Sequence, residues 1–416
     1  MHTTNSAPLD YAHEAYIAVH GGAGIHRKTS EFEVKRAIRE ACTRALNSSA
    51  RPESTAISLV AEATCVLEDS PHLNAGLGSN LTLDGTVECD AAIMSGDSSF
   101  GSVAAVSGVK NPIQLAKSIR QYSYKEDKLG RIPPLTLVSA GATSFARSDT
   151  SIQLVPPSSL ITESSHDQWK RWKDKLDSND GSAFNDMPCE MRSELRNIQD
   201  TVGAVVWHAK SGAAAGVSSG GLLLKLPGRV GEAAVFGAGC WAQQGSNLRD
   251  AACAATGVAC SVSGTGEHIV RAQLARLIGE RVMATLSAGV GNVYPQNDVV
   301  EGNREEENED EVQSDGDDVA DTHTILQQIL GKEFWEPYRK KDELSPSAGI
   351  LLLTKETGEN GEASVRLWCA FTTPSMAIGY ASPRHPKPKA MILKHPDASN
   401  MRNGEKPRIF ITAIPL

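Results

Sequence analysis

Thr201 combines a residue type and a position that could support nucleophilic chemistry. The polar segment before it ends in Asp200, and Thr201 itself begins the apolar run TVGAVVWH. A threonine hydroxyl is a weak nucleophile and needs a base within hydrogen-bond reach. If the peptide bond before Thr201 were cut, its own α-amine, with a pKa of about 7.7–8.0, could serve as that base. An ordinary strand start produces the same pattern, so the residues alone leave both interpretations open.

The cysteine and histidine spacing does not indicate metal chemistry. The 8 cysteines are scattered and none forms a C-x-x-C pair, which is typical of buried thiols in a reducing compartment. The run AVHGGAG at 18–24 contains a glycine turn, but it lacks the Walker lysine and the G-x-G-x-x-G spacing of phosphate-binding loops. We therefore expect no metal and no cofactor.

Composition favours a globular protein with a large core. The chain has 416 residues, of which 40% are hydrophobic, so it could form two or three domains or one large domain with insertions. It contains no apolar run near the ~20 residues that span a bilayer, and its start does not resemble a secretory signal. It also lacks a broad basic face of the kind that binds nucleic acid. We expect no membrane or nucleic-acid partner and a cytoplasmic location, with the nucleus as a second site.

The acidic charge is concentrated in one segment. Residues 301–321 hold 11 acidic residues and one arginine, about −10 in charge, so the rest of the chain is close to neutral within a total of −9. Such a run repels itself and has few apolar groups to bury. It predicts a disordered acidic insertion over 296–320, with an acidic partner-binding tract as the alternative.

Hydrophobic periodicity predicts alternating clusters of strands and helices in the first 145 residues. Residues 15–24 read as a strand, and 86–95 and 102–109 as further β-like runs; 135–141 reads as a short buried strand. Helical spacing is predicted over 31–47, 55–69, 113–121 and 141–147. From 146 to 200 the chain is polar and weakly patterned, which predicts a flexible linker.

After Thr201 the pattern becomes rich in short strands. They are predicted over 201–208, 212–219, 233–242, 348–354, 364–373, 375–382 and 407–414, with one long amphipathic helix over 267–286. Strands and helices are segregated rather than strictly alternating, which favours an α+β layered body with antiparallel sheets.

Five separate motifs resemble the plant-type asparaginase family of N-terminal nucleophile hydrolases. They are AVHGGAG, NAGLGSNLTLDGTVECDAAIM, DTVGAVVW, SSGGLLLKLPGRVGEAAVFGAGCWA and SGTGEHIVR, in the family's order and spacing. Within the family, LEDSPHLNAGLGSNL, GRIPP, the long linker and FTTPSMAIGY look most like the endopeptidase branch, the threonine aspartases (taspases). The resemblance implies an α+β fold, a four-layer αββα sandwich.

The resemblance also implies roles for individual residues. Thr201 matches the nucleophile, freed by autocleavage of the Asp200–Thr201 bond. The positions that match its supporting and oxyanion-stabilising groups are Ser219, Asn74, Thr265 and Gly266.

Substrate binding is implied at two further positions. Arg229 matches the arginine that grips the substrate carboxylate, a task suited to its planar fork. Glu232 stands where small asparaginases carry the aspartate that holds the substrate's free α-amino group. An endopeptidase meets no free amine there, so this departure fits the protease branch.

The expected product of processing is an α subunit, residues 1–200, and a β subunit, residues 201–416, within one composite domain. By resemblance, two such heterodimers form a homodimer. The expected activity is threonine-type endopeptidase cleavage after aspartate, on protein substrates with Asp at P1. The alternative is an isoaspartyl peptidase or L-asparaginase acting on small amides, and a non-catalytic binding module is a third possibility.

Overall fold

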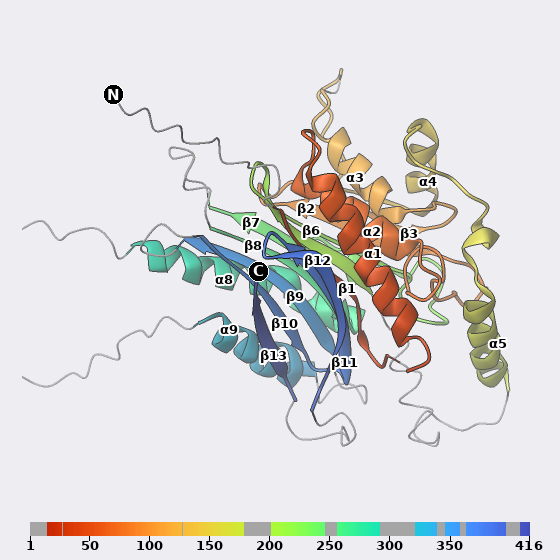
Figure 1. Cartoon of the computed structure of the whole chain (residues 1–416). Coiled ribbons are helices and arrows are strands. Elements are labelled where there is room, and N and C mark those ends of the chain that lie inside the picture. The colour runs from red at the N-terminus through yellow and green to blue at the C-terminus, as the bar shows by residue number, and fades with distance from the viewer. Residues whose placement is uncertain are drawn as a thin grey trace, which may run out of the picture.

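The computed structural model describes residues 15–26, 28–126, 128–178, 201–245, 256–291, 321–338, 346–357, 363–396 and 408–416. Two β-sheets pack face to face, and helices cover the outer face of each (Figure 1). This arrangement confirms the predicted α+β class and the four-layer αββα sandwich.

The larger sheet has eight strands in the order β12-β11-β1-β5-β6-β2-β3-β4. All its pairs are antiparallel except β3 with β4. The bounds are β1 (Ala15–Gly24), β2 (Cys89–Ser95), β3 (Phe100–Val106), β4 (Thr136–Val138), β5 (Val202–His208), β6 (Gly212–Ser219), β11 (Ser375–Ser382) and β12 (His385–Lys394).

The smaller sheet is wholly antiparallel and has the order β13-β10-β9-β8-β7. Its strands are β7 (Cys240–Gln244), β8 (Gly257–Gly264), β9 (Ala348–Thr357), β10 (Ala363–Phe371) and β13 (Phe410–Pro415). The strands β8 and β12 were not predicted from the sequence.

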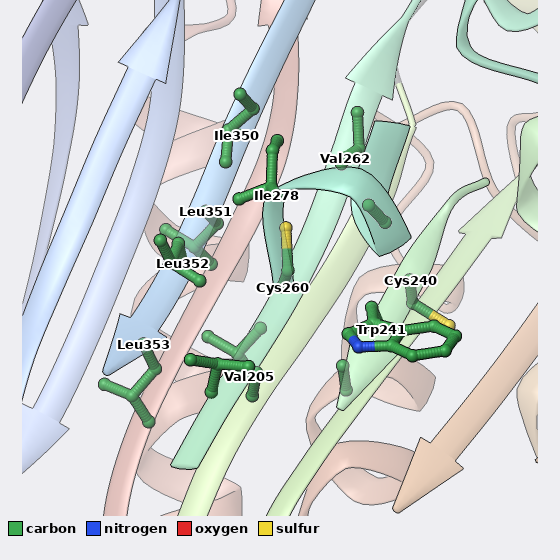
Figure 2. Packing of buried hydrophobic residues seen from close by; sticks show 14 of the residues in the cluster. Val205, Cys240, Trp241, Cys260, Val262, Ile278, Ile350, Leu351, Leu352 and Leu353 are labelled. Carbon is green, nitrogen blue, oxygen red and sulfur yellow. The ribbon is translucent and has the colours of Figure 1, made fainter. Parts of the chain in front are cut away.

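The side chains of β5 alternate between the two hydrophobic clusters of the sandwich. Val202, Ala204 and Val206 join the core beneath the outer helices, whereas Val205 and Trp207 join the core between the sheets. Successive strand residues point to opposite faces, so a strand buried on both sides reads as a continuous apolar run. Figure 2 shows part of the cluster that Val205 joins, with buried residues from both sheets and from the helix that carries Ile278.

Three helices cover the larger sheet: α1 (Glu31–Ser49), α2 (Ala56–Glu68) and α3 (Pro112–Tyr122). The α2 helix begins at a capping box, in which Thr55 and Ser58 exchange side-chain and backbone hydrogen bonds. Pro112 opens α3, where its missing N–H would have no helical partner anyway. All three helices were predicted at these places.

The smaller sheet is covered by α7 (Gly266–Ala272), α8 (Leu274–Gly291), α9 (Thr322–Gln328), the π-helical segment η5 (Ile329–Trp335) and α10 (Glu336–Tyr338). The prediction of one helix over 267–286 is wrong, because Gln273 adopts a left-handed conformation with φ 45°. The next N–H groups, of Ala275 and Arg276, donate to the carbonyls of Ala238 and Gly237. These tertiary hydrogen bonds therefore explain why the helix is interrupted at Gln273.

The predicted linker is wrong for residues 146–178. This range contains the end of α4 (Ser139–Ser148), a 3₁₀ turn η2 (Pro157–Leu160) and α5 (Glu163–Asp177). Trp169 Nε1 donates to Thr82 O at 2.8 Å, and Trp172 is buried. These two tryptophans dock α5 on the rest of the protein, although its mostly polar sequence shows only a weak hydrophobic pattern. Residues 179–200 and the acidic insertion at 296–320 lie outside the described residues.

Two strand predictions also needed correction. The predicted buried strand at 135–141 is the three-residue edge strand β4, and Val138 is exposed. The run at 233–242 is a strand only from Cys240, because η4 (Glu232–Ala234) is a 3₁₀ turn. Apolar runs cannot distinguish a buried strand from an edge strand or a turn.

Segments before and after Thr201 contribute strands to the same sheet. The N-terminal strand β1 pairs with β5 on one side and β11 on the other, so it is enclosed by C-terminal strands. Strands from both sides of Thr201 in the sequence are therefore interleaved within one sheet. Within the described residues, the helices are too short or too polar to cross a membrane.

Candidate active site

Thr201 lies immediately before β5 and is buried. It lines a small cavity between the two sheets, together with Asn74, Ser219, Gly221, Leu222, Arg229, Glu232, Gly264 and Gly266. Its backbone N–H donates to Ser263 Oγ at 3.3 Å, a contact between residues 62 positions apart. Five of the predicted site residues besides Thr201 therefore meet at one place.

The Thr201 hydroxyl has two close oxygen neighbours. Its Oγ1 lies 3.0 Å from Ser219 Oγ and 2.7 Å from Glu232 Oε1. A hydroxyl has one proton to donate, and an ionised carboxylate is the stronger acceptor. The Thr201 proton is therefore directed at Glu232 when that carboxyl is ionised, and the Ser219 hydroxyl can donate back to Thr201. Ser219 Oγ also accepts the Gly221 N–H at 3.0 Å.

Asn74 supports the loop that follows β6. Its Nδ2 donates to Gly221 O at 2.9 Å, and its Oδ1 accepts the Asn80 N–H at 2.9 Å. Asn80 Nδ2 reaches the same Gly221 carbonyl at 2.9 Å. Gly221 has φ +67°, a conformation that side chains disfavour. The two asparagines thus hold a left-handed turn beside Ser219.

Arg229 directs unused hydrogen-bond donors toward the cavity. Its Nε donates to Glu267 Oε1 at 2.9 Å, and its side chain is 13% exposed. Nη2 lies 2.8 Å from the same Glu267 oxygen, but within the described part of the chain neither Nη1 nor Nη2 has a hydrogen-bond acceptor in suitable geometry. Buried polar groups without partners are rare and suggest a missing ligand. A carboxylate fits this fork.

Gly266 provides the space that Arg229 and Glu232 occupy. A Cβ at this position would lie 2.5 Å from Glu232 Oε2 and 2.7 Å from Arg229 Nη2. The neighbouring Thr265 does not line the cavity; its Oγ1 lies 3.0 Å from Ser347 Oγ and accepts the Ser347 N–H at 3.3 Å. The structure therefore places Gly266 in the cavity but turns the Thr265 hydroxyl to Ser347.

Burial sets the electrostatics of the cavity wall. It raises the pKa of the Glu232 carboxyl, an effect partly offset by the Arg229 charge and by the Thr201 hydrogen bond. Burial also raises the pKa of Asp90, which accepts the Gly231 N–H at 2.7 Å and so anchors the loop between Arg229 and Glu232. The pKa of Lys225 is lowered by burial. Glu232 in the cavity wall and Asp90 beside the wall thus lose their protons less readily than exposed carboxyl groups.

Sequence reasoning did not single out Ser263 or Asp90. Both lie on strands next to the site, Asp90 on β2 and Ser263 on β8. Ser263 shares one face of β8 with Ser261, an alternation of hydroxyl groups that could have identified it. His20 lies on β1, next to the nucleophile strand β5 in the same sheet, with Nε2 2.8 Å from Ser261 Oγ, and burial lowers its pKa to about 4. It fits a neutral core histidine.

Asp200, the expected residue before the cut, lies outside the described residues. Among the described residues, histidine, cysteine and acidic side chains do not gather in groups that could hold a metal ion. The chemistry that the described side chains can support is a hydroxyl nucleophile beside an acceptor carboxylate and a cationic fork.

Comparisons with known proteins agree with this geometry. Residues 13–292 match the Asparaginase family. The Plant-type L-asparaginase of Pyrococcus abyssi is 35% identical over 274 residues, which cover 65% of this chain and 81% of that protein. The Isoaspartyl peptidase/L-asparaginase of Bos taurus is 33% identical over 263 residues, 63% of this chain and 74% of that protein. A Probable isoaspartyl peptidase/L-asparaginase 2 of Arabidopsis thaliana is 34% identical over 276 residues, 62% and 78% respectively. This chain belongs to the asparaginase family of plant-type asparaginases and isoaspartyl peptidases, within the N-terminal nucleophile hydrolases.

Proposed function

We propose that the protein is a self-processing amidohydrolase whose nucleophile is the Thr201 hydroxyl, freed by cleavage of the Asp200–Thr201 bond. The observation that carries this proposal is the convergence of Ser219 and Glu232 on Thr201 Oγ1, within a cavity at the start of a buried strand. A merely structural threonine would need neither the second acceptor nor the cavity.

After self-cleavage, Thr201 would carry a free α-amine next to its own hydroxyl. The position of its nitrogen, 3.3 Å from Ser263 Oγ, offers that amine a hydrogen-bond partner. An α-amine with a pKa near 8 suits a general base at neutral pH. The hydroxyl would attack the substrate amide carbon and form an ester, which water then hydrolyses.

The substrate would carry a carboxylate next to the scissile amide. The Nη1 and Nη2 groups of Arg229 are the donors available for it. Gly266 keeps the cavity open beside these donors, since even a methyl group there would contact both Arg229 and Glu232. We propose an aspartyl-type carboxylate as the group recognised.

The first candidate substrates are small amides, namely L-asparagine and β-aspartyl peptides. The names of the relatives, L-asparaginase and isoaspartyl peptidase, favour this class. Such substrates carry a free α-ammonium or a free carboxylate near the reacting amide, and Glu232 and Arg229 have the complementary charges.

The second candidate is endopeptidase cleavage after aspartate, as in the threonine aspartases. The Glu232 contact favours it. Because Glu232 Oε1 accepts a hydrogen bond from Thr201 Oγ1, a substrate ammonium would compete with the Thr201 hydroxyl for this oxygen. A substrate without a free amine at that place, such as an internal peptide bond, avoids the conflict. The residue before Thr201 is Asp200, which would be the P1 residue of the self-cleavage.

Self-cleavage provides the first test. Purified protein should convert into two fragments, the second beginning at Thr201, as read by intact-mass and N-terminal analysis. Thr201→Ala should remain one chain, because it has no hydroxyl for the N-to-O acyl shift. A parent chain that stays intact through prolonged incubation would contradict the proposal.

A side-by-side assay separates the two substrate classes. Processed protein is given free L-asparagine, a β-aspartyl dipeptide and a peptide with an internal Gln-x-Asp-Gly sequence. Release of ammonia or of the dipeptide's amino acid identifies the small-amide activity. Cleavage of the internal peptide after aspartate identifies the endopeptidase.

A further inference from the structure

Glu232 contacts the Thr201 hydroxyl directly, and substrate binding does not require this contact. Its side chain is buried, and its Oε1 lies 2.7 Å from the Thr201 hydroxyl oxygen. Its other oxygen, Oε2, would lie only 2.5 Å from a Cβ at Gly266. The carboxylate is thus held between the nucleophile and the wall of the cavity.

The intact chain has a catalytic problem that the processed chain does not. Before the cut, the Thr201 nitrogen is an amide and cannot take a proton, yet the hydroxyl still needs a base. Of the described residues that line the cavity, Glu232 and Arg229 are the ones with ionisable side chains, and an arginine stays protonated. Glu232 alone among these lining residues can accept the proton.

We propose that the Glu232 carboxylate is the general base for self-cleavage, accepting the Thr201 Oγ1 proton in the intact chain. This inference rests on the self-processing proposed above and goes beyond it, because it gives the precursor a base that the mature enzyme replaces with its α-amine.

The step balances without any co-reactant except water. Thr201 Oγ1 bonds to the carbonyl carbon of residue 200 while its proton passes to Glu232. The bond from that carbon to the Thr201 nitrogen then breaks, and the nitrogen takes the proton from Glu232 and becomes an α-amine. Water hydrolyses the resulting ester, which releases the carboxylate of residue 200 and restores the Thr201 hydroxyl.

The charged groups around Glu232 come from several elements. Arg229 and Lys225 lie on its own loop, Asp90 lies on β2, and Glu267 on α7 pairs with Arg229. His268, also on α7, stacks on Tyr338. Burial raises the Glu232 pKa above its usual value, and a base must be deprotonated to act. The self-cleavage rate should therefore rise with pH through this raised pKa and level off above it.

The test compares full-length precursors of the parent, Glu232→Gln, Glu232→Asp and Glu68→Gln. Glu68 is the matched control, a buried carboxyl that contacts Ser218 instead of Thr201. Each precursor is produced under conditions that limit processing, then incubated between pH 5 and pH 9 and sampled by intact mass. Circular dichroism and thermal melting verify that each variant is folded.

We expect Glu232→Gln to slow self-cleavage by about 10²-fold or more, and its residual rate to lose the rise with pH. Glu232→Asp keeps a carboxylate on a side chain that is one methylene shorter. Its self-cleavage rate should therefore lie between those of the parent and Glu232→Gln, and should still rise with pH. Glu68→Gln should process within threefold of the parent.

Three results would overturn the proposal. The first is a folded Glu232→Gln precursor that processes at the parental rate. The second is a slowed variant that keeps the parental pH profile, since that would assign Glu232 a positioning role. The third is a Glu232→Gln chain that hydroxylamine splits at Thr201 as fast as it splits the parent, because the ester would then form without help from this base. A parent that never self-cleaves would instead refute the proposed function itself.

Discussion

Arg229→Lys is the substitution that best separates a binding role from a structural one. Lysine keeps the positive charge and most of the aliphatic stem, but it replaces a planar fork of donors with a single ammonium. In the parent, Nε donates to Glu267 and Nη2 forms an ion pair with the same carboxylate, whereas Nη1 has no acceptor among the described residues. The substitution therefore removes the Nη1 donor and the second arm of the fork, which a substrate carboxylate could use.

The size of the effect follows from those donors. A hydrogen bond between charged groups contributes about 1.5–3 kcal/mol, and a factor of ten in rate corresponds to about 1.4 kcal/mol. Losing one of two parallel bonds in the transition state should lower kcat/KM by roughly 10²-fold. The Glu267 pair is weak as a source of stability because Glu267 is 45% exposed. We expect the melting temperature to change by less than about 4 °C.

The assay measures kcat/KM on fully processed protein, with whichever substrate class the parent hydrolyses. Arg276→Lys is the control, since Arg276 Nε also pairs with a glutamate, Glu280 Oε1, at 2.8 Å on an exposed helix surface. That variant should retain full activity. If Arg229→Lys stays within threefold of the parent, or if both variants lose activity equally, Arg229 is not the carboxylate clamp.

Two further predictions follow from the packing around the cavity. Gly266→Ala should lower kcat/KM at least tenfold, because its Cβ would lie 2.5 Å from Glu232 Oε2 and 2.7 Å from Arg229 Nη2. Its melting temperature should stay within a few degrees of the parent. Parental kinetics would show that these two side chains can move aside without loss of activity. Burial raises the pKa of Glu68 to about 8. Between about pH 4.5 and 8, the Glu68 carboxyl is therefore protonated in the folded state and ionised in the unfolded state. The free energy of unfolding falls as pH rises through this window. Glu68→Gln should therefore flatten the fall of melting temperature across this window, and two curves that fall in parallel would contradict the assigned pKa.

The docking of α5 shows one limit of reading the sequence alone. Its residues are mostly polar, and nothing in their period distinguishes them from a linker. Trp169 anchors the helix by donating to Thr82 O, 87 residues away in the chain, and Trp172 is buried. Contacts over such a separation do not appear in a local hydrophobic pattern. The edge position of β4 was missed for a similar reason, because the burial of a strand depends on its neighbours in the sheet.

The local pattern of the sequence determined the strands around the nucleophile. The border at Thr201, the continuous apolar run of β5 and the helices α1 to α3 are properties of consecutive residues, whose side-chain period fixes their faces. The motif order determined the family. The tertiary structure decided which oxygens reach Thr201. Glu232 is 31 residues from it in sequence, and Ser263 is 62. Whether such side chains meet within 3 Å or turn away, as Thr265 does toward Ser347, depends on how two sheets and their loops pack. Hydrophobic periodicity indicates which face of each strand is buried, but it does not indicate how close two side chains from different elements will lie.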